Sequence, residues 1–427
     1  MTFALAVLPV ALLLAGFPIY LVLLASAAAA LVFFMNVPLA VLHQNLYGAI
    51  DSFALLAVPF FLYAGELMGR GSVAGRIVDV VQAGVGSVRG SVGLTTIGTS
   101  AIFGAISGAS AATVATVGRI MLPAMRNARY PERFSAGLIT AVGAIDIIIP
   151  PSIPLIIYGM SAEESVTRLY AAGVLPGLLI AGLLAAYVFW YARRTGMPAA
   201  GRFEARAFGR AAVRGAWALG APVIILGGIY GGVFSPVEAA GVACVYAALV
   251  TRLVYRELSW REVVDAAGAT ALLTAQLLII VACASVFSWV LTVNQVPAQL
   301  AQWVQAAALE PWRVLAAINV LLLVAGCFVD PLSAILVLTP LLVPVVKALG
   351  IDTVHFGLIV TVNLAIGLFT PPFGINIFVA QSALGLPLGT IYRGIGPFLV
   401  LYLLALVLIT YVPQISLWSM RLFLAGV

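Results

Sequence analysis

Two carboxylates, Asp146 and Asp330, lie inside long apolar stretches of the 427-residue sequence, far from any Lys or Arg. An ionisable side chain in such surroundings is costly and is functional by default. Asp146 could serve an ion or a proton, or it could form a hydrogen bond with a Ser or Thr of a neighbouring segment. Asp330 precedes Pro331 and could be a ligand or the N-cap of the next helix, and these two roles are compatible.

Two proline pairs, Pro150-Pro151 and Pro371-Pro372, interrupt apolar stretches that are otherwise long enough to be helices. Proline removes a helical hydrogen bond and clashes with the preceding turn, so each pair frees several carbonyl groups. Freed carbonyls are costly in an apolar environment unless they find a partner. They suit a bare cation, whereas the N-terminus of the half-helix that follows suits a carboxylate.

A turn of small and hydroxylated residues, Ser107-Gly108-Ala109-Ser110, interrupts another apolar stretch. Close backbone approach and neutral hydroxyl oxygens at this turn would suit weakly held Na⁺. The alternative interpretation is that Gly, Ala and Ser only allow helices to pack closely. The pairing of this turn with a proline break favours the ion site.

These considerations give two predicted cation sites and a set of predicted substrate contacts. Asn376, like Asn363, could be a ligand or could only join neighbouring helices. The candidates for the first cation site are Ser107, Gly108, Ser110, Asp146 and Pro151; those for the second are Asp330, Ser333, Thr370, Pro371 and Gly374; those for substrate are Ser107, Ser152, Asp330 and Asn376.

The composition indicates the kind of element that must position these residues. The sequence is 63% hydrophobic and only 8% charged, with a mean hydropathy of +1.16, whereas soluble domains carry roughly 25% charged residues. This excludes a soluble enzyme, a nucleic-acid binder and a disordered chain. Long apolar segments in lipid must be helical because the backbone has to satisfy its own hydrogen bonds. The sequence therefore predicts an all-α polytopic membrane protein in contact with membrane lipid.

The apolar stretches fall into full spans and broken ones. Residues 91–122 and 312–346 break in the middle, which predicts two re-entrant hairpins. Residues 134–159 and 355–383 are spans broken by the proline pairs, and the segments 72–88 and 294–310 are amphipathic arms. We expect the remaining spans at 3–34 (interrupted at Gly16-Phe17-Pro18), 51–69, 170–191, 216–233, 237–255, 268–292 and 392–413.

The basic residues predict the orientation of these spans. If the hairpins enter from opposite sides, 17 of the 21 Lys and Arg residues fall on one side. The other side holds only Arg168, Arg313, Lys347 and Arg421. By the positive-inside rule the first side is cytoplasmic, so the first hairpin opens from the cytoplasm and the second from outside.

A single shift along the chain superimposes Pro150-Pro151 on Pro371-Pro372 and repeats the order of arm, hairpin and broken span. The predicted organisation is an inverted repeat, 51–191 and 268–413. An N-terminal scaffold segment 1–50, linking helices 192–267 and a tail 414–427 complete the chain. Inverted repeats with discontinuous helices are typical of secondary transporters. No Walker, HExxH or GxSxG motif is present, so we do not expect an enzyme.

Five segments in order resemble the large membrane subunit of tripartite ATP-independent periplasmic (TRAP) transporters. They are 52–68, Ile106–Ser110, Ile149–Ile153, Phe234–Ala240 and Thr370–Gly374. The resemblance implies an elevator-type importer in the bacterial inner membrane, driven by Na⁺ and carrying a small organic carboxylate. It also implies two partners, a periplasmic substrate-binding protein and a small four-helix membrane subunit. The family commonly has Ser where Ala109 stands and Gly where Asp146 stands.

Three other functions are weighed against this one. A stand-alone ion-coupled anion transporter of the same broad superfamily would need no partner proteins. A channel fits poorly with two hairpins entering from opposite sides. An intramembrane enzyme would need a convergent group of titratable side chains, and only Asp146 and Asp330 lie deep enough.

Overall fold

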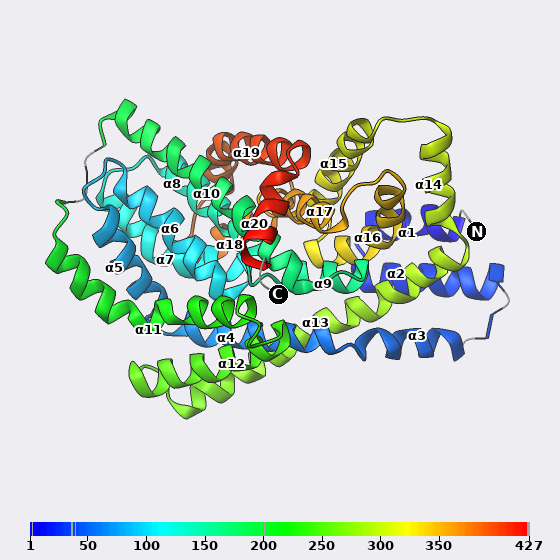
Figure 1. Cartoon of the computed structure of the whole chain (residues 1–427), viewed down its shortest axis with the longest axis horizontal. Helices are drawn as coiled ribbons and strands as arrows, with labels where there is room; N and C mark the ends of the chain where they lie inside the picture. The colour runs from blue at the N-terminus through cyan, green and yellow to red at the C-terminus, as the bar shows by residue number, and fades with distance from the viewer. Residues whose placement is uncertain (2, 36, 39, 198, 200, 425–427) are drawn as a thin grey trace.

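The computed structural model describes residues 1–427 except 2, 36, 39, 198, 200 and 425–427. The described residues form helices and loops without any strand, which confirms the all-helical prediction. Among these described residues, eight helices are long and apolar enough to cross a membrane. In Figure 1, a row along one side of the molecule is formed by α3 (Ala40–Ile50), α4 (Ala57–Arg70), α12 (Pro236–Leu249) and α13 (Trp260–Val293). The interrupted helices lie between this row and α10 (Val166–Thr195) and α19 (Leu388–Tyr411).

The N-terminal segment is divided as its Gly and Pro residues predict. A π-helix at Phe3–Val7 continues into α1 (Leu8–Leu14), and the helix is interrupted at 15–18. The next helix, α2 (Ile19–Ala30), ends in a second π-helix, Leu31–Met35. Gly16 has a φ of +82°, a left-handed conformation that glycine adopts without steric cost. A further helix, α3 (Ala40–Ile50), was not expected, and it packs beside α13 (Trp260–Val293).

The first set of interrupted helices follows a short 3₁₀ turn at Phe53–Leu56. It consists of α4 (Ala57–Arg70), α5 (Val73–Val85), α6 (Ser91–Ser107), α7 (Ser110–Asn127), α8 (Glu132–Val142) with the 3₁₀ turn Gly143–Ile147, α9 (Ile153–Ala162) and α10 (Val166–Thr195). The helices α6 and α7 are the limbs of the first predicted hairpin, and α8 and α9 are the halves of the first broken span.

The second set has the same order. After α13 come α14 (Val296–Ala306), α15 (Pro311–Phe328), α16 (Pro331–Ala348), α17 (Thr353–Gly367), α18 (Ile375–Leu384) and α19 (Leu388–Tyr411). The shift that carries Pro150 to Pro371 also carries the bounds of α7 onto those of α16, and it brings α6 and α9 almost onto α15 and α18. The spacing of these elements is therefore the same in both sets.

Two helices link the sets, α11 (Ala205–Tyr230) and α12 (Pro236–Leu249), the latter ending in a π-helix at Val250–Val254. The helices α11 and α13 begin well before the spans predicted at 216–233 and 268–292. The early start of α13 follows from a capping box, in which Ser259 and Glu262 satisfy each other's backbone N–H groups. Hydropathy alone misses such polar helical ends.

The broken spans lie at the centre of the molecule. Every residue of α17 from Val354 to Gly367, and every residue of α8 from Phe134 to Val142, is buried. Helices that are apolar all round belong in a core. Around them, α12 packs on α4 and α11, and α13 packs on α2, α3 and α4, forming the outer row of Figure 1.

The end of the chain differs from its prediction as a tail. Residues Gln414–Leu424 form α20, which packs along α10 with Ser416 and Ser419 buried. Ser419 Oγ donates to Ala172 O at 3.3 Å. The prediction failed because this helix is amphipathic and too short to read as a span; the last three residues lie outside the described part of the chain.

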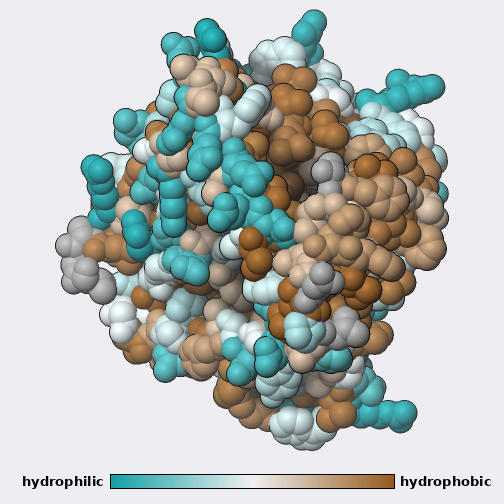
Figure 2. Space-filling view, turned by 90° about the vertical axis from the view of Figure 1, so that its right-hand side faces the viewer, coloured by the Kyte–Doolittle hydropathy of each residue, from teal (hydrophilic) through white to brown (hydrophobic). Residues whose placement is uncertain are grey.

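The surface shows where lipid must meet the protein. Figure 2, which views the end of the molecule that carries α3 and α14, shows apolar side chains gathered over one part of this face and hydrophilic ones along another. Exposed apolar residues of the described chain include Tyr47 of α3 and Trp303 of α14. Large exposed apolar areas mark contact with a membrane or a partner.

Candidate functional site

The first hairpin turn is closed by a glycine. The helix α6 ends at Ser107, Gly108 adopts a left-handed φ of +58°, and α7 begins at Ser110. A Cβ on Gly108 would lie 3.2 Å from the carbonyl oxygen of Pro151. The turn and the first proline break, which were predicted to face each other, are therefore in contact.

Asp146 lies beside this turn, on the 3₁₀ segment after α8, and is fully buried. Ser107 Oγ lies 3.5 Å from Asp146 Oδ2 and 3.3 Å from Thr113 Oγ1. Asp146 Oδ1 has no hydrogen-bond partner among the described residues, and none of the ion pairs between those residues involves Asp146. The hydroxyl neighbour of Oδ2 is consistent with a hydrogen bond to a Ser or Thr, and the unsatisfied Oδ1 is consistent with a site for an ion or a proton.

Gly104 makes room for the carboxylate. A Cβ at this position would fall 2.4 Å from Asp146 Oδ1 and 2.9 Å from Asp146 Cα. The sequence analysis did not single out Gly104. A glycine one helical turn before the hairpin tip leaves room for a neighbouring group. The sequence alone does not tell that this neighbour is Asp146.

Ser110 and Asn376 join the two sets of helices. Ser110 Oγ lies 3.0 Å from Asn376 Oδ1 and 2.9 Å from Asn376 Nδ2, and Nδ2 also donates to Thr140 O at 3.2 Å. All three residues are buried. Asn376 begins the second half of the second broken span, so its side chain reaches across to the first hairpin and the first broken span.

Ser152 has a structural role in this arrangement. It is the N-cap of α9: its hydroxyl donates to Ile147 O at 2.5 Å and accepts from Leu155 N at 3.4 Å. The residue is fully buried. The hydroxyl that was predicted to contact substrate is thus engaged in closing the first break.

Asp330 takes the capping role that was one of its two predicted interpretations. Its Oδ1 accepts from the backbone N–H groups of Leu332 and Ser333, both at 3.1 Å, and Ser333 Oγ donates to Oδ2. Both oxygens of the carboxylate therefore accept hydrogen bonds at the start of α16. An ion would have to bind oxygens that already cap this helix.

The second hairpin turn lies against the second proline break through glycine. A Cβ on Gly367 would fall 2.3 Å from Gly326 O, and the rings of Phe328 and Phe373 lie 5.8 Å apart. Thr370 Oγ1 donates to Ile366 O at 2.6 Å, and Gly374 N donates to Thr370 O at 3.1 Å. The sequence places Gly326 at the break within 312–346, but it does not indicate the contact of Gly326 with Gly367.

The two breaks differ in exposure although both contain a cis Pro-Pro bond. Pro150, Pro151 and Ser152 are buried, whereas Pro371, Pro372 and Phe373 are exposed. The two hairpins also differ in how their limbs pack. The limbs α6 and α7 pack together, but α15 packs on α17 while α16 packs on α13, α14 and α9. The first break is therefore buried beneath its hairpin, whereas the prolines of the second break are exposed.

Asn363 packs as a link between helices. Its Nδ2 donates to Asn319 Oδ1 at 2.8 Å, and Asn319 Nδ2 donates to Thr410 Oγ1 at 3.1 Å. This chain joins α15, α17 and α19. Asn319 and Thr410 were not predicted, because polar residues at single positions of a span carry no signal about their partners.

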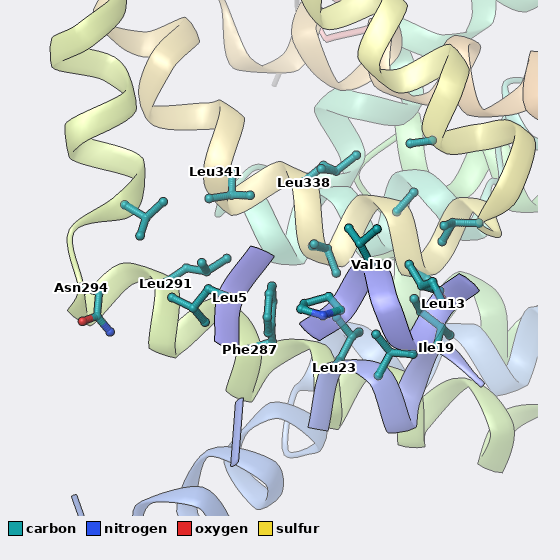
Figure 3. Close-up of a pocket in the computed structure, with 18 of the residues that line it drawn as sticks. Leu5, Val10, Leu13, Ile19, Leu23, Phe287, Leu291, Asn294, Leu338 and Leu341 are labelled. Carbon is teal, nitrogen blue, oxygen red and sulfur yellow. The ribbon is translucent and has the colours of Figure 1, made fainter. Parts of the chain in front are cut away.

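An apolar cavity of about 810 Å³ adjoins the second hairpin (Figure 3). Leu5, Val10 and Leu23 of the N-terminal helices line it together with Phe287 and Leu291 of α13. Its polar lining residues are Asn294, Gln299 and Ser333. The cavity touches the turn at Ser333, but no carboxylate is among its described lining residues.

The oxygens near the first break fit a cation better than those near the second. Asp146 Oδ1 is buried without a donor in the described structure, and the hydroxyls of Ser107 and Thr113 lie on the other side of the same carboxylate. Na⁺ in discontinuous-helix carriers is held by such oxygens together with unwound carbonyls. No group of three His, Cys, Asp or Glu occurs in the described part of the chain, so we find no basis there for a chelated transition metal.

Comparison with known proteins decides the family. The profile described as "Tripartite ATP-independent periplasmic transporter, DctM component" matches residues 6–415. The chain belongs to this family. It is 42% identical over 373 residues to the C4-dicarboxylate TRAP transporter large permease protein of Pseudomonas aeruginosa, covering 87% of each chain. It is 40% identical to the ectoine/5-hydroxyectoine TRAP transporter large permease protein of Ruegeria pomeroyi, covering 96% of each.

A solved structure shows the same fold. The YdaH transporter of Alcanivorax borkumensis matches with a TM-score of 0.66 over 97% of this chain and 99% of that one, at 16% identity. The family membership confirms the resemblance seen in the sequence. It also confirms that this TRAP large permease is a multi-pass membrane transporter protein and not an enzyme.

Proposed function

We propose that the protein is the membrane permease of a Na⁺-coupled importer of a small organic carboxylate in the bacterial inner membrane. A periplasmic binding protein would deliver the substrate, and a small four-helix membrane subunit would brace the long outer helices. The observation that carries the proposal is the buried oxygen cluster at the first hairpin turn, within a chain of the TRAP family.

The coupling to Na⁺ is supported by the charge balance at this cluster. A buried carboxylate without a cationic partner is strongly disfavoured, because it loses its hydration without compensation. A bound Na⁺ would supply the missing positive charge at Asp146 Oδ1. Ser107 and Thr113 lie beside the other oxygen, Asp146 Oδ2, so the remaining ligands at Oδ1 would be carbonyls freed by the proline break.

The elevator mechanism and the inverted repeat are supported by the arrangement of the two sets. Their hairpins and broken spans recur at one spacing, the one that separates Pro150 from Pro371. Each set also contributes a half-helix to the other: α18 packs on α7, and α9 packs on α16. The two hairpins and the two broken spans can therefore move as one body against the outer row of α4, α12 and α13.

The substrate class rests on relatives whose names differ. The permease of Pseudomonas aeruginosa is named for C4-dicarboxylates and that of Ruegeria pomeroyi for ectoine, at nearly equal identity to this chain. A small carboxylate is suited to the N-terminus of a half-helix such as α18 (Ile375–Leu384). The N–H groups of Asn376 itself are engaged with Leu368, Ser110 and Thr140.

The test is uptake into liposomes that contain the permease and its small subunit. With the binding protein outside, we expect an inward Na⁺ gradient to drive uptake of the carboxylate that this binding protein holds. A matched K⁺ gradient is the control. Absence of Na⁺-driven uptake would overturn the coupling, and uptake without the binding protein would favour the stand-alone carrier.

A further inference from the structure

A stripe of arginines begins the linking helix α11. Arg206, Arg210 and Arg214 are four residues apart and therefore lie on one face. All three are exposed. The stretch was expected to be a loop, but because α11 begins at Ala205 the three guanidinium groups stand in a row.

The row ends where the helix enters the membrane. The 26 residues of α11 span roughly 39 Å, which exceeds a hydrocarbon core of about 30 Å. Trp217 follows the last arginine and is 51% exposed, and Val223 beyond it is 71% exposed. Tryptophan marks the level of lipid headgroups and exposed valine the level of acyl chains. Arg214, three residues before Trp217, is thus at headgroup height, and Arg210 and Arg206 follow on the side away from the acyl chains.

These arginines lack, within the described structure, the carboxylate partners that others have. Arg70, Arg76, Arg126, Arg168 and Arg313 each form an ion pair, whereas no ion pair among the described residues includes Arg206, Arg210 or Arg214. Like charges four residues apart repel each other on a helix. An anion between them would remove this repulsion.

The arginines line a hollow of about 680 Å³ between α11 and the arm α5, which pack side by side (Figure 1). Arg210 and Arg214 face it from α11, and Ser72, Arg76 and Asp79 face it from α5. Arg76 is paired with Glu257 at 3.1 Å. A neighbouring hollow of about 710 Å³ is lined by Arg206, Arg210 and Arg214, with Val213 beside them.

With Arg76 paired to Glu257, the two guanidinium groups of Arg210 and Arg214 against the carboxylate of Asp79 leave the region positive. Guanidinium groups bind phosphate through paired hydrogen bonds. Val213 is 76% exposed and, with Trp217, gives the same face an apolar continuation toward the membrane. A ligand that fits has a phosphate at one end and an apolar chain at the other.

We propose that the groove between α5 and α11 binds the phosphate headgroup of an anionic phospholipid, with its acyl chains along Val213 and Trp217. The site is separate from the oxygen cluster at the first hairpin. It would tie the arm of the first set to the linking helix through a lipid of the leaflet that faces the arginine-rich side.

The test is lipid binding to the purified permease, with its small subunit, in detergent micelles. The probe is phosphatidylglycerol, measured by native mass spectrometry, with phosphatidylcholine and inorganic phosphate as separate arms. We expect saturable binding of phosphatidylglycerol alone. The double variant R210Q/R214Q should weaken it about 10- to 30-fold, from roughly 1 kcal/mol per arginine.

The control is R193Q/R194Q, which removes the same charge from the end of α10. These two arginines lie over the rings of Phe189 and Trp190, outside the groove, so the control should bind phosphatidylglycerol as the parent does. Equal weakening in both variants would overturn the site. Equally tight binding of inorganic phosphate would overturn a lipid ligand. Loss of the small subunit from R210Q/R214Q with unchanged lipid binding would instead assign the groove to a protein partner.

Discussion

At the scale of single residues, the carboxylates Asp146 and Asp330 are in opposite situations. Asp330 accepts two backbone hydrogen bonds and one from Ser333. Asp146 has one distant hydroxyl contact and an oxygen that no described residue satisfies. One carboxylate is used by the fold, and the other is available to a ligand.

We expect Asp146→Asn to make the protein more stable in Na⁺-free buffer, because it removes an uncompensated buried charge. The same change should abolish most of the stabilisation that Na⁺ gives the parent protein. Thermal unfolding with Na⁺ and with choline measures both effects. A parent protein that Na⁺ does not stabilise, or a variant that Na⁺ still stabilises as fully, would separate Asp146 from the ion.

The capping role of Asp330 predicts a difference between two substitutions. Asp330→Ala should cost about 1 kcal/mol of stability, whereas Asp330→Asn keeps a capping oxygen and should cost far less. Unfolding midpoints of the two variants measure this difference. If Asp330→Asn alone lowers the apparent Na⁺ affinity in uptake, the carboxylate acts as a ligand in addition to its cap.

At the scale of elements, glycines set how closely the helices approach. Gly137 on α8 and Gly394 on α19 lie backbone against backbone, and a Cβ on Gly394 would fall 2.1 Å from Arg133 O. This contact joins the first broken span to the last helix of the second set. Gly396 lies slightly further along the same helix, and a Cβ there would have no described atom within 4 Å.

Gly394→Ala should therefore destabilise the protein by about 1–3 kcal/mol, since neither backbone can yield without separating the helices. Gly396→Ala is the matched control and should be neutral or up to about 1 kcal/mol stabilising. Thermal unfolding of both variants in one detergent gives the comparison. Equal midpoints would mean that α19 slides freely on α8.

The start of the arm α5 is fixed by a group of polar side chains. Ser72 and Arg76 donate to Glu257, and the Arg76 guanidinium lies 3.8 Å from the centre of the Tyr255 ring. Burial alone would raise the pKa of Glu257, but the hydrogen bonds from Ser72 and Arg76 hold that pKa below its ordinary value of 4.5. The ionised form is therefore favoured by folding.

Glu257→Gln should lower stability at pH 7 by about 1–3 kcal/mol, the usual range for hydrogen bonds to a charged group. A lowered pKa means that this contribution is complete above the ordinary value and disappears as the pH falls through the folded-state value. The variant and parent should thus converge below about pH 4. Glu310→Gln, in the exposed pair with Arg313, is the control and should change little at either pH.

Much of the element pattern could be predicted from Gly, Pro and hydropathy, because these residues act locally on the backbone. The starts of α11 and α13 could not, because Arg206 and Glu262 lower hydropathy where the helix has already begun. The contact of Ser110 with Asn376 joins residues 266 positions apart. No local rule relates such residues, so the partners in the site come only from the structure.

At the scale of the whole molecule, the two sets of helices interlock. The half-helix α18 lies on the first hairpin, and α9 lies on the second. Neither set alone can bury its own broken span. The helices α11 and α12 connect the sets, and a helix boundary separates them from the first set: α10 ends at Gly196, which has a left-handed conformation, and α11 begins at Ala205.

A chain cut within 201–204 should therefore still assemble when both pieces are produced together. We expect the two pieces to co-purify and to unfold together. Each piece made alone should aggregate, because the faces that meet α7, α9, α16 and α18 would be exposed. Co-purification measures the first outcome, and independent folding of either piece would contradict the interlock.

The unequal exposure of the two proline breaks has a consequence for transport. In this arrangement Pro371 and Phe373 are exposed, while Pro150 and Ser152 are buried. If the protein transports a substrate as proposed, the second proline break must become buried before water can reach the first. The structure described here is then one of two conformations. In the other conformation, residues 371–373 are buried and residues 150–152 are hydrated.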